Sequence, residues 1–420
     1  MLQPPSLTPL LPQTHILPNM RPLHCFPNNA LELVKFDITL EAGSRYQPCK
    51  CLSHAANRLF GEATALRDAL QVAEFLDFRG ITVERMTDVC VGNLSFYFLR
   101  RYADDLFPLV REMFDATYAA GGGSPLTQPM LDACVASRRL QLATGFQKTS
   151  FVARNRFYEM LYGFDHPLGT YAMPDDVDKL TLDSVADFIG SHYRLGNAHL
   201  VLSGQIDDDL LSLADQYLAP ATGDIPSEPL LPPPHSNNQA FKQSSIPNAV
   251  QSTIRIGRIL PMAWDSTDYA RFMVLNTVLG GYFGSRLMSN IREDKGYTYG
   301  IYSTTQIYRG SIVFYITADV AAEATQAAVD EVFNEIDRLQ QHLIPDDELE
   351  RVRNYMMGDL IRSIDGVFEI SERYRQMAAT HVTEQLTTNL LDAIAHVTPT
   401  QLQTLAQTYL TDLVSVVVGS

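Results

Sequence analysis

Hydrophobic residues recur at helical spacing in the segment that follows Asp346. Acidic residues fill the first turn, and the apolar positions after it are three or four residues apart. This spacing predicts an amphipathic helix that begins near Asp346 and buries one face. The apolar positions are Leu349, Val352, Met356, Leu360 and Ile364.

Residues 34–40 instead alternate between apolar and polar side chains, which predicts a half-buried strand. Short apolar runs at 200–204 and 414–419 also read as strands, and each follows a helical segment that a threonine, Thr181 or Thr398, can cap. Groups of strands next to groups of helices predict an α+β fold with mainly antiparallel sheets.

The two halves of the chain resemble each other. Residues 92–98 and residues 310–316 both begin with glycine and contain a Phe-Tyr pair, at an offset of 218, and a helical pattern follows each. The helix-and-strand ends described above recur in the same order in both halves. We therefore expect an internal duplication of a unit of roughly 200 residues.

A proline-rich stretch at 219–247 separates these halves and contains seven of the 23 prolines. Proline at this density interrupts helices and central strands, so the stretch is predicted to be a semi-rigid linker. The expected domains are therefore residues 1–218 and 248–420.

Composition narrows the functional classes. The chain has 420 residues, 32 of them Lys or Arg and 48 Asp or Glu, for a formal charge of −16. Such a charge argues against binding to nucleic acid or anionic lipid and would suit basic substrates or simple solubility.

No apolar run approaches the roughly 18 residues of a membrane span. Five cysteines at irregular spacing, and no positive charge before Arg21, predict a cytoplasmic protein without a disulfide framework.

Motifs for metal or nucleophilic chemistry are scarce. The sequence has no His-x-x-x-His pair, no phosphate-binding loop and no Gly-x-Ser-x-Gly elbow. Cys49, Cys51 and His54 offer soft ligands within six residues, but a zinc site needs three or four convergent ligands. Ordinary, partly buried thiols are the favoured interpretation.

The most informative segment is residues 276–300. It contains Leu-Gly-Gly, then Ser-Arg-Leu, and then Arg292 and Tyr299 seven positions apart with Gly296 between them. This run resembles the second half of the zinc peptidases of the pitrilysin and mitochondrial processing peptidase family. The resemblance extends over essentially the whole chain, including residues 42–46 and 163–169. It implies two homologous, sandwich-like α/β domains that form one half of a clam-shaped assembly around a chamber.

The catalytic motif of that family is His-x-x-Glu-His. At the matching place this chain has His54, then Asn57 for the glutamate and Arg58 for the second histidine. Asparagine cannot take a proton, and arginine carries a permanent positive charge that repels zinc. The family's third ligand, a glutamate roughly 75 residues further on, is also missing, because no glutamate occurs between Glu112 and Glu159. The resemblance implies a degenerate motif that holds no metal.

Arg292 and Tyr299 allow two interpretations. On composition alone, Arg292 lies in a solvated turn and Tyr299 packs in the core. The resemblance implies instead that Arg292 binds a substrate carbonyl and that the Tyr299 hydroxyl donates to the substrate backbone or to an oxyanion.

The leading hypothesis is therefore a non-catalytic subunit of a heterodimeric zinc peptidase that acts on unfolded peptides. A homologous partner would supply His-x-x-Glu-His and the zinc, and this chain, with no cofactor of its own, would supply Arg292 and Tyr299. The alternative is a structural or peptide-binding homologue, alone or as a homodimer, with no role in hydrolysis. An independent peptidase with a rewired site is a third possibility, which zinc bound by the isolated chain would support.

Overall fold

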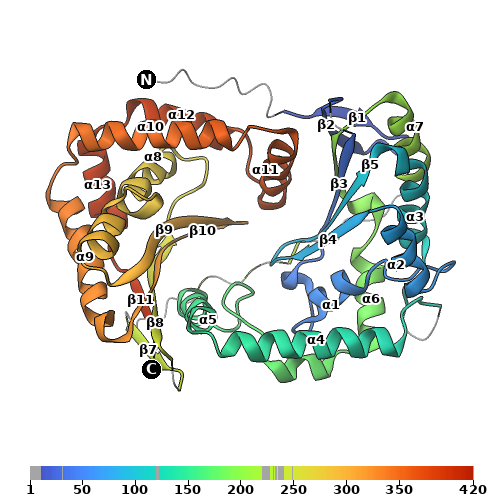
Figure 1. The fold of residues 1–420 in the computed structure, drawn as a ribbon, viewed down its shortest axis with the longest axis horizontal. Coiled ribbons are helices and arrows are strands. Elements are labelled where there is room, and N and C mark those ends of the chain that lie inside the picture. Colours follow the sequence, from blue (N-terminus) through green and yellow to red (C-terminus); the bar gives the residue numbers. More distant parts are fainter. Residues whose placement is uncertain are drawn as a thin grey trace.

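Two sheets, one in each half of the chain, form the centre of the fold (Figure 1). The structure is a computed structural model that describes residues 11–30, 32–119, 123–219, 228–229, 231, 234, 241–247 and 249–419. The strands of the first half are β1 (Gln13–Ile16), β2 (Pro22–Pro27), β3 (Leu33–Leu40), β4 (Thr82–Thr87), β5 (Gly92–Leu99) and β6 (His199–Gly204). Its α-helices are α1 (Leu52–Leu59), α2 (Ala69–Phe78), α3 (Ala103–Asp115), α4 (Gln128–Phe146), α5 (Thr149–Tyr162), α6 (Leu182–His192) and α7 (Asp208–Tyr217).

The second half repeats this mixture of elements. Its strands are β7 (Phe241–Ser245), β8 (Gln251–Leu260), β9 (Thr298–Tyr308), β10 (Ser311–Ala321) and β11 (Val414–Gly419). Its α-helices are α8 (Thr267–Asn276), α9 (Thr325–Gln341), α10 (Asp346–Arg362), α11 (Val367–Thr380), α12 (Gln385–His396) and α13 (Pro399–Tyr409). Two π-helical segments, η6 (Thr277–Gly281) and η7 (Met288–Asp294), lie between α8 and β9.

The two sheets have the same topology over five strands. The first runs β1-β2-β6-β3-β5-β4 and the second β7-β11-β8-β10-β9. In each sheet one pair is parallel, β2 with β6 and β7 with β11, and the other pairs are antiparallel. The predicted α+β fold with mainly antiparallel sheets is therefore confirmed.

The predicted offset also recurs in the helices. Helix α4 begins at residue 128 and α10 at residue 346, a separation of 218, and α5 and α11, which begin at residues 149 and 367, are separated by the same number. A duplicated unit explains this correspondence, although the duplication itself stays a prediction.

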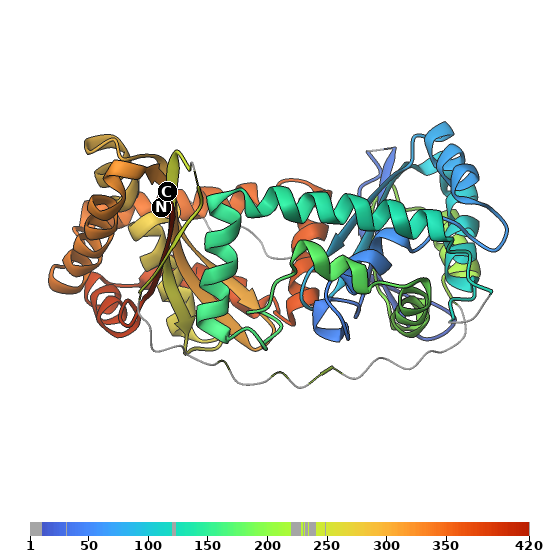
Figure 2. The same ribbon diagram turned by 90° about the horizontal axis from the view of Figure 1, so that it is seen from below.

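The two halves exchange a helix. Helix α5 packs on the second sheet beside β8 and β11, as Figures 1 and 2 both show. Its residues Ala153 and Phe157 form one buried apolar cluster with Val313, Val416 and Val418 of that sheet. In return, α11 packs on β2, β3 and β6 of the first sheet. Each half therefore covers a sheet face of the other.

The contact of α11 corrects the prediction for β3. We expected a half-buried strand, but Lys35, Asp37 and Thr39, which form its polar face, are at most 5% exposed. The cause is α11, which covers this face and brings Glu372 to 2.8 Å from Lys35 Nζ, while Asp37 lies 3.1 Å from the same atom. The α11 interface is therefore charged, whereas the α5 interface is apolar.

The proposed domain boundaries are not tested by this structure, because most of residues 219–247 lie outside the described part. One described piece touches the first half, where Arg45 donates a hydrogen bond of 2.8 Å to the carbonyl of Pro229. None of the helices in the described residues is long and apolar enough to cross a lipid bilayer.

Candidate functional site

The residues predicted to form a degenerate metal motif, His54, Asn57 and Arg58, lie on α1. His54 is partly buried, and burial, followed by the charges of Arg138 and Arg58, lowers its pKa to about 4. Asn57 is 2% exposed and donates a hydrogen bond of 3.4 Å to the carbonyl of Asn93. Arg58 is exposed and forms an ion pair with Glu62, four residues further along the chain. Asn57 and Arg58 therefore both make contacts with other residues of this chain.

The residues around His54 do not fit a zinc ion. In the part of the chain that the structure describes, no three His, Cys, Asp or Glu side chains come together as a ligand set. Burial raises the pKa of the Cys49 and Cys51 thiols, so these groups stay protonated, whereas zinc binds thiolates.

Arg292 and Tyr299 lie at the two ends of a turn between η7 and β9. Gly296 adopts a left-handed φ of 67° in this turn, and the Tyr297 backbone N–H donates to the carbonyl of Ile291 at 3.0 Å. Only glycine adopts such a φ without strain, so Gly296 allows the close turn that the sequence suggested.

The two side chains differ in their surroundings. The Arg292 guanidinium lies over the Phe283 ring, 4.6 Å from its centroid. Tyr299 is 93% exposed, so the interpretation that it packs in the core is wrong. No hydrogen bond engages its hydroxyl among the described residues, and the group is free to donate to a bound molecule.

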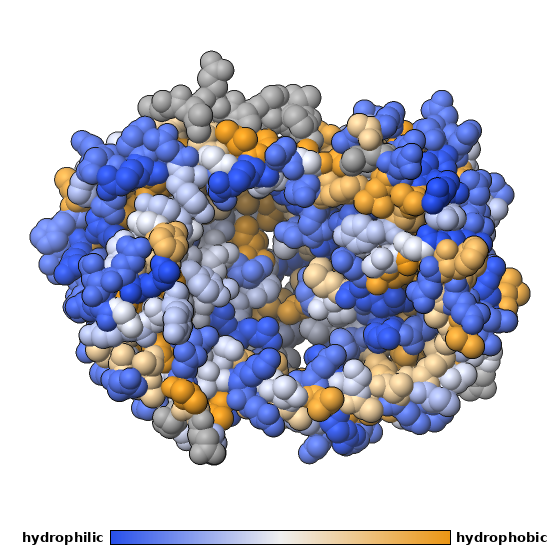
Figure 3. Space-filling model, viewed as in Figure 1, coloured by the Kyte–Doolittle hydropathy of each residue, from blue (hydrophilic) through white to orange (hydrophobic). Residues whose placement is uncertain are grey.

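Two adjoining cavities connect the neighbourhood of His54 to that of Tyr299. The first, here called the His54 cavity, has a volume of about 590 Å³ and is lined from both halves. The second, the Tyr299 cavity, has a volume of about 570 Å³. Phe151, Arg154 and Arg255 line both, so they form a shared wall. The space-filling view shows a hollow between the halves (Figure 3). Arg292 lines neither of these two cavities.

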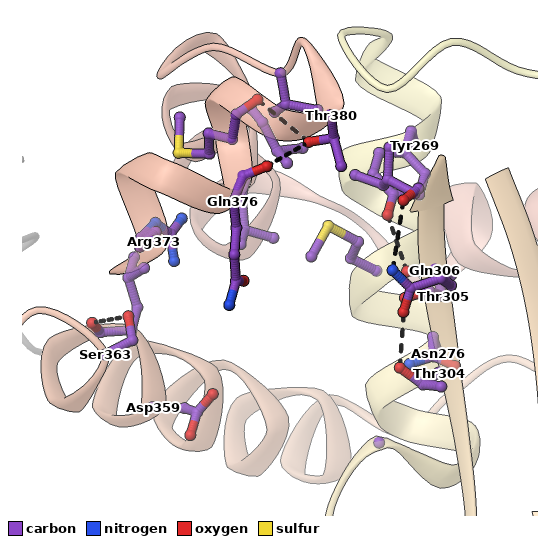
Figure 4. A pocket seen from close by; sticks show the side chains of 18 of the residues that line it. Tyr269, Asn276, Thr304, Thr305, Gln306, Asp359, Ser363, Arg373, Gln376 and Thr380 are labelled. Carbon is purple, nitrogen blue, oxygen red and sulfur yellow. Dashed lines mark hydrogen bonds between the residues drawn. The ribbon is translucent and has the colours of Figure 1, made fainter. Parts of the chain in front are cut away.

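A third cavity, of about 700 Å³, lies mainly in the second half between β9, α10 and α11. Figure 4 shows Asp359 on one wall, Gln306 on the opposite wall and Gln376 between them. Met86 of β4 also lines it, so this cavity lies beside edge strands of both sheets. No local sequence pattern marks this cavity, because its polar residues come from separate elements, namely α8, η6, β9, α10 and α11.

Comparisons with known proteins agree with this fold. Residues 179–356 match the family model "Peptidase M16 inactive domain". The chain is 22% identical over 356 residues to an uncharacterized zinc protease of Rickettsia felis, which covers 81% of both chains. It is 23% identical over 252 residues to a Helicobacter pylori protein named non-peptidase homolog YmxG, covering 58% of this chain and 55% of the other.

A solved structure shows the same architecture. The peptidase M16 inactive domain from Pseudomonas fluorescens superposes with a TM-score of 0.83 at 19% identity and covers 97% of both chains. The motif in the sequence, the matched model and this fold agree with one another. Residues 179–356 therefore correspond to the inactive domain of M16 peptidases, and the whole chain has the fold of the pitrilysin and mitochondrial processing peptidase family that its sequence resembles, without the His-x-x-Glu-His motif.

Proposed function

We propose that this chain is the non-catalytic subunit of a heterodimeric zinc peptidase that acts on unfolded peptides. A homologous partner supplies the zinc and the general base, and this chain supplies Arg292 and Tyr299. Two observations support the absence of catalysis by this chain alone. The residues around His54 do not fit zinc, and the YmxG relative is named a non-peptidase homolog.

The exposure of Tyr299 is the observation that carries the proposal. A tyrosine that is 93% exposed, with a hydroxyl that no described residue engages, contributes little to folding. Placed against a partner's zinc site, the same hydroxyl donates a hydrogen bond where negative charge develops on the substrate. Phe283 holds the Arg292 guanidinium on the same half, where it is available to a substrate carbonyl.

Edge strands support the peptide as a substrate. Among the strands of the described residues, β4 pairs only with β5 and β9 only with β10, so both are edges of their sheets. An extended peptide can add to such an edge through its backbone hydrogen bonds. Both strands also contribute residues to the third cavity, Met86 from β4 and Gln306 from β9.

A cytoplasmic location belongs to the same proposal. All five cysteines are free thiols, and four of them are buried. Free thiols persist in a reducing compartment.

The test is reconstitution. We expect no peptide hydrolysis by this chain alone and hydrolysis when it is mixed with a His-x-x-Glu-His homologue from the same source. Tyr299→Phe and Arg292→Ala should each lower kcat/KM of the mixture by about 100-fold, since a donor to a developing oxyanion contributes about that much.

The partly buried Tyr217 and the exposed Arg351 line none of the cavities described above and provide controls. Tyr217→Phe and Arg351→Ala should leave the activity unchanged, and light scattering should show the same assembly for all variants. Full activity of the mixture with Tyr299→Phe and Arg292→Ala would refute the proposal and would favour a scaffold that takes no part in hydrolysis.

A further inference from the structure

The wall shared by the His54 and Tyr299 cavities contains a buried, unpaired arginine. Arg255 of β8 is 8% exposed and its Nε is buried without a hydrogen-bond partner. In the described residues, no carboxylate oxygen lies within 4.0 Å of its guanidinium nitrogens. Its nearest recorded companions are aromatic rings, with centroids 4.2 Å away for Tyr315, 5.7 Å for Phe157 and 5.9 Å for Tyr158.

A buried charge on β3, which has the same place in the strand order of the first sheet as β8 has in the second, provides a contrast. Asp37 of β3 and Arg255 of β8 are 218 positions apart, and both face the helix that the other half contributes. Asp37 has a counter-ion, since Lys35 Nζ lies 3.1 Å from it, but Arg255 has none among the described residues. A largely buried charge without a counter-ion is unfavourable, so a carboxylate that enters either cavity would be stabilised by Arg255.

The charges around Arg255 favour a negatively charged ligand. Arg154 and Lys148 of the Tyr299 cavity, and Arg138 and Lys50 of the His54 cavity, are all cationic. Acidic residues on the same two cavities are few, and they are Asp88 and Asp319.

Both aspartates are already engaged by the fold. Asp88 accepts hydrogen bonds from the backbone N–H groups of Cys90 and Val91, and Asp319 accepts one from the Thr253 hydroxyl. His54 adds no charge of either sign near neutral pH, because its lowered pKa keeps it neutral. The wall is therefore basic, although the whole chain has a charge of −16.

We propose that this wall is a subsite for the side-chain carboxylates of an acidic peptide, with Arg255 as the buried anchor. The planar guanidinium can hold a carboxylate through two parallel hydrogen bonds, and the aromatic rings around it fix its plane. Arg154, on the same wall and exposed, provides a second cation for a neighbouring carboxylate. The inference rests on the proposed function in one respect, that peptides occupy these cavities.

Binding by the isolated full-length chain tests the subsite without any hydrolysis. The probes are three fluorescent peptides of one length and one backbone pattern, carrying glutamate, glutamine or lysine at the same positions. We expect the glutamate peptide to bind at least about tenfold more tightly than the other two, with an affinity that falls as salt rises.

Two substitutions to methionine on the same strand assign the effect. Arg255→Met should weaken the glutamate peptide by about tenfold or more, since a charged, desolvated contact is lost. Arg258→Met, whose guanidinium donates to the carbonyl of Thr411 rather than lining the shared wall, should leave binding unchanged. If Arg255→Met unfolds the chain, the exposed Arg154→Met variant still reports, with an expected loss of several-fold.

The outcomes separate the alternatives. Equal binding of the glutamate and glutamine peptides, or unchanged binding by Arg255→Met and Arg154→Met, would overturn the proposal. Inorganic phosphate or free glutarate that competes as well as the peptide at equal concentration would also overturn it, in favour of a small-anion site. The binding test uses the isolated chain, so its result is independent of the reconstitution test. Peptide binding can lack a preference for glutamate while hydrolysis by the mixture still depends on Tyr299. Equally, the glutamate preference can hold while hydrolysis does not depend on Tyr299.

Discussion

At the scale of single residues, the positions predicted to be a degenerate metal motif make contacts within the fold. Asn57 now joins the first sheet through the Asn93 carbonyl, and its own carbonyl accepts a hydrogen bond of 3.2 Å from Arg85 Nε. Arg58 points outward and pairs with Glu62. Reversing these changes therefore disturbs a packed site.

Restoring the motif should consequently fail to restore zinc. In the Asn57→Glu/Arg58→His variant we expect no stoichiometric zinc after dialysis, because a third ligand is still missing. Burying a carboxylate at the position of Asn57 should also lower the free energy of unfolding by about 1–3 kcal/mol. Elemental analysis and urea unfolding measure both effects. One tightly bound zinc per chain would show that a ligand exists which we have not identified.

At the scale of elements, the sequence predicted where helices and strands lie more accurately than it predicted which of their side chains are buried. The helix expected from Asp346 begins there, and the segments capped by Thr181 and Thr398 are α6 and α13. The side chains of β3 and β8 show the limit, because Lys35 and Arg255 both occupy polar positions of alternating strands. Only the helix that arrives from the other half buries them, and no local pattern encodes a contact between residues so distant in the sequence.

Some residues of the candidate site could be predicted from the sequence and others could not. The degenerate motif and the Arg292 and Tyr299 pair could be found because a family pattern marks them. Arg255 and Arg154 carry no such mark, since one is a single polar residue in a strand and the other an exposed residue of a helix. Their importance comes from a shared wall, which exists only once α5 has packed on β8.

The α11 interface should weaken at mildly acidic pH. His199 of β6 stacks on His24 with centroids 4.9 Å apart, beside Tyr374 of α11. Burial, followed by the charges of His24 and Arg375, lowers the pKa of His199 from 6.5 to about 4. The unfolded chain therefore takes up this proton at a higher pH than the folded chain does. Stability is lost as the pH falls from about 6.5 toward 4.

Between about pH 7 and about pH 5 we expect a loss of about 2 kcal/mol from His199, measured by urea unfolding. His199→Gln should remove this share of the pH dependence and leave the share of His54, His24 and His192, whose pKa values burial also lowers. Glu372 does not contribute in this range: hydrogen bonds from Arg375 and Lys35 outweigh its burial and hold its pKa at about 2, so its stabilising effect is lost only below about pH 4.5. An unchanged slope in His199→Gln would contradict this assignment.

At the scale of the whole molecule, net charge and local charge have opposite signs. The chain carries −16, yet the wall between the His54 and Tyr299 cavities is cationic. The sequence alone suggested basic substrates from the total charge. The structure shows that a total says little about a cavity, because most acidic side chains lie elsewhere on the molecule.

The exchange of α5 and α11 has a consequence for the covalent chain. Each half supplies a helix without which the other half exposes a sheet face, Val313 and Val416 in one case and the Lys35 charge in the other. Residues 1–234 and 235–420, coexpressed as separate polypeptides, should therefore copurify as a one-to-one complex with the unfolding midpoint little changed at high concentration. Each fragment alone should aggregate. Independent, monomeric fragments would contradict this expectation. If the two fragments do copurify, the covalent link between the halves is not needed for folding. Two separate genes, one for each half, could then produce the same folded assembly.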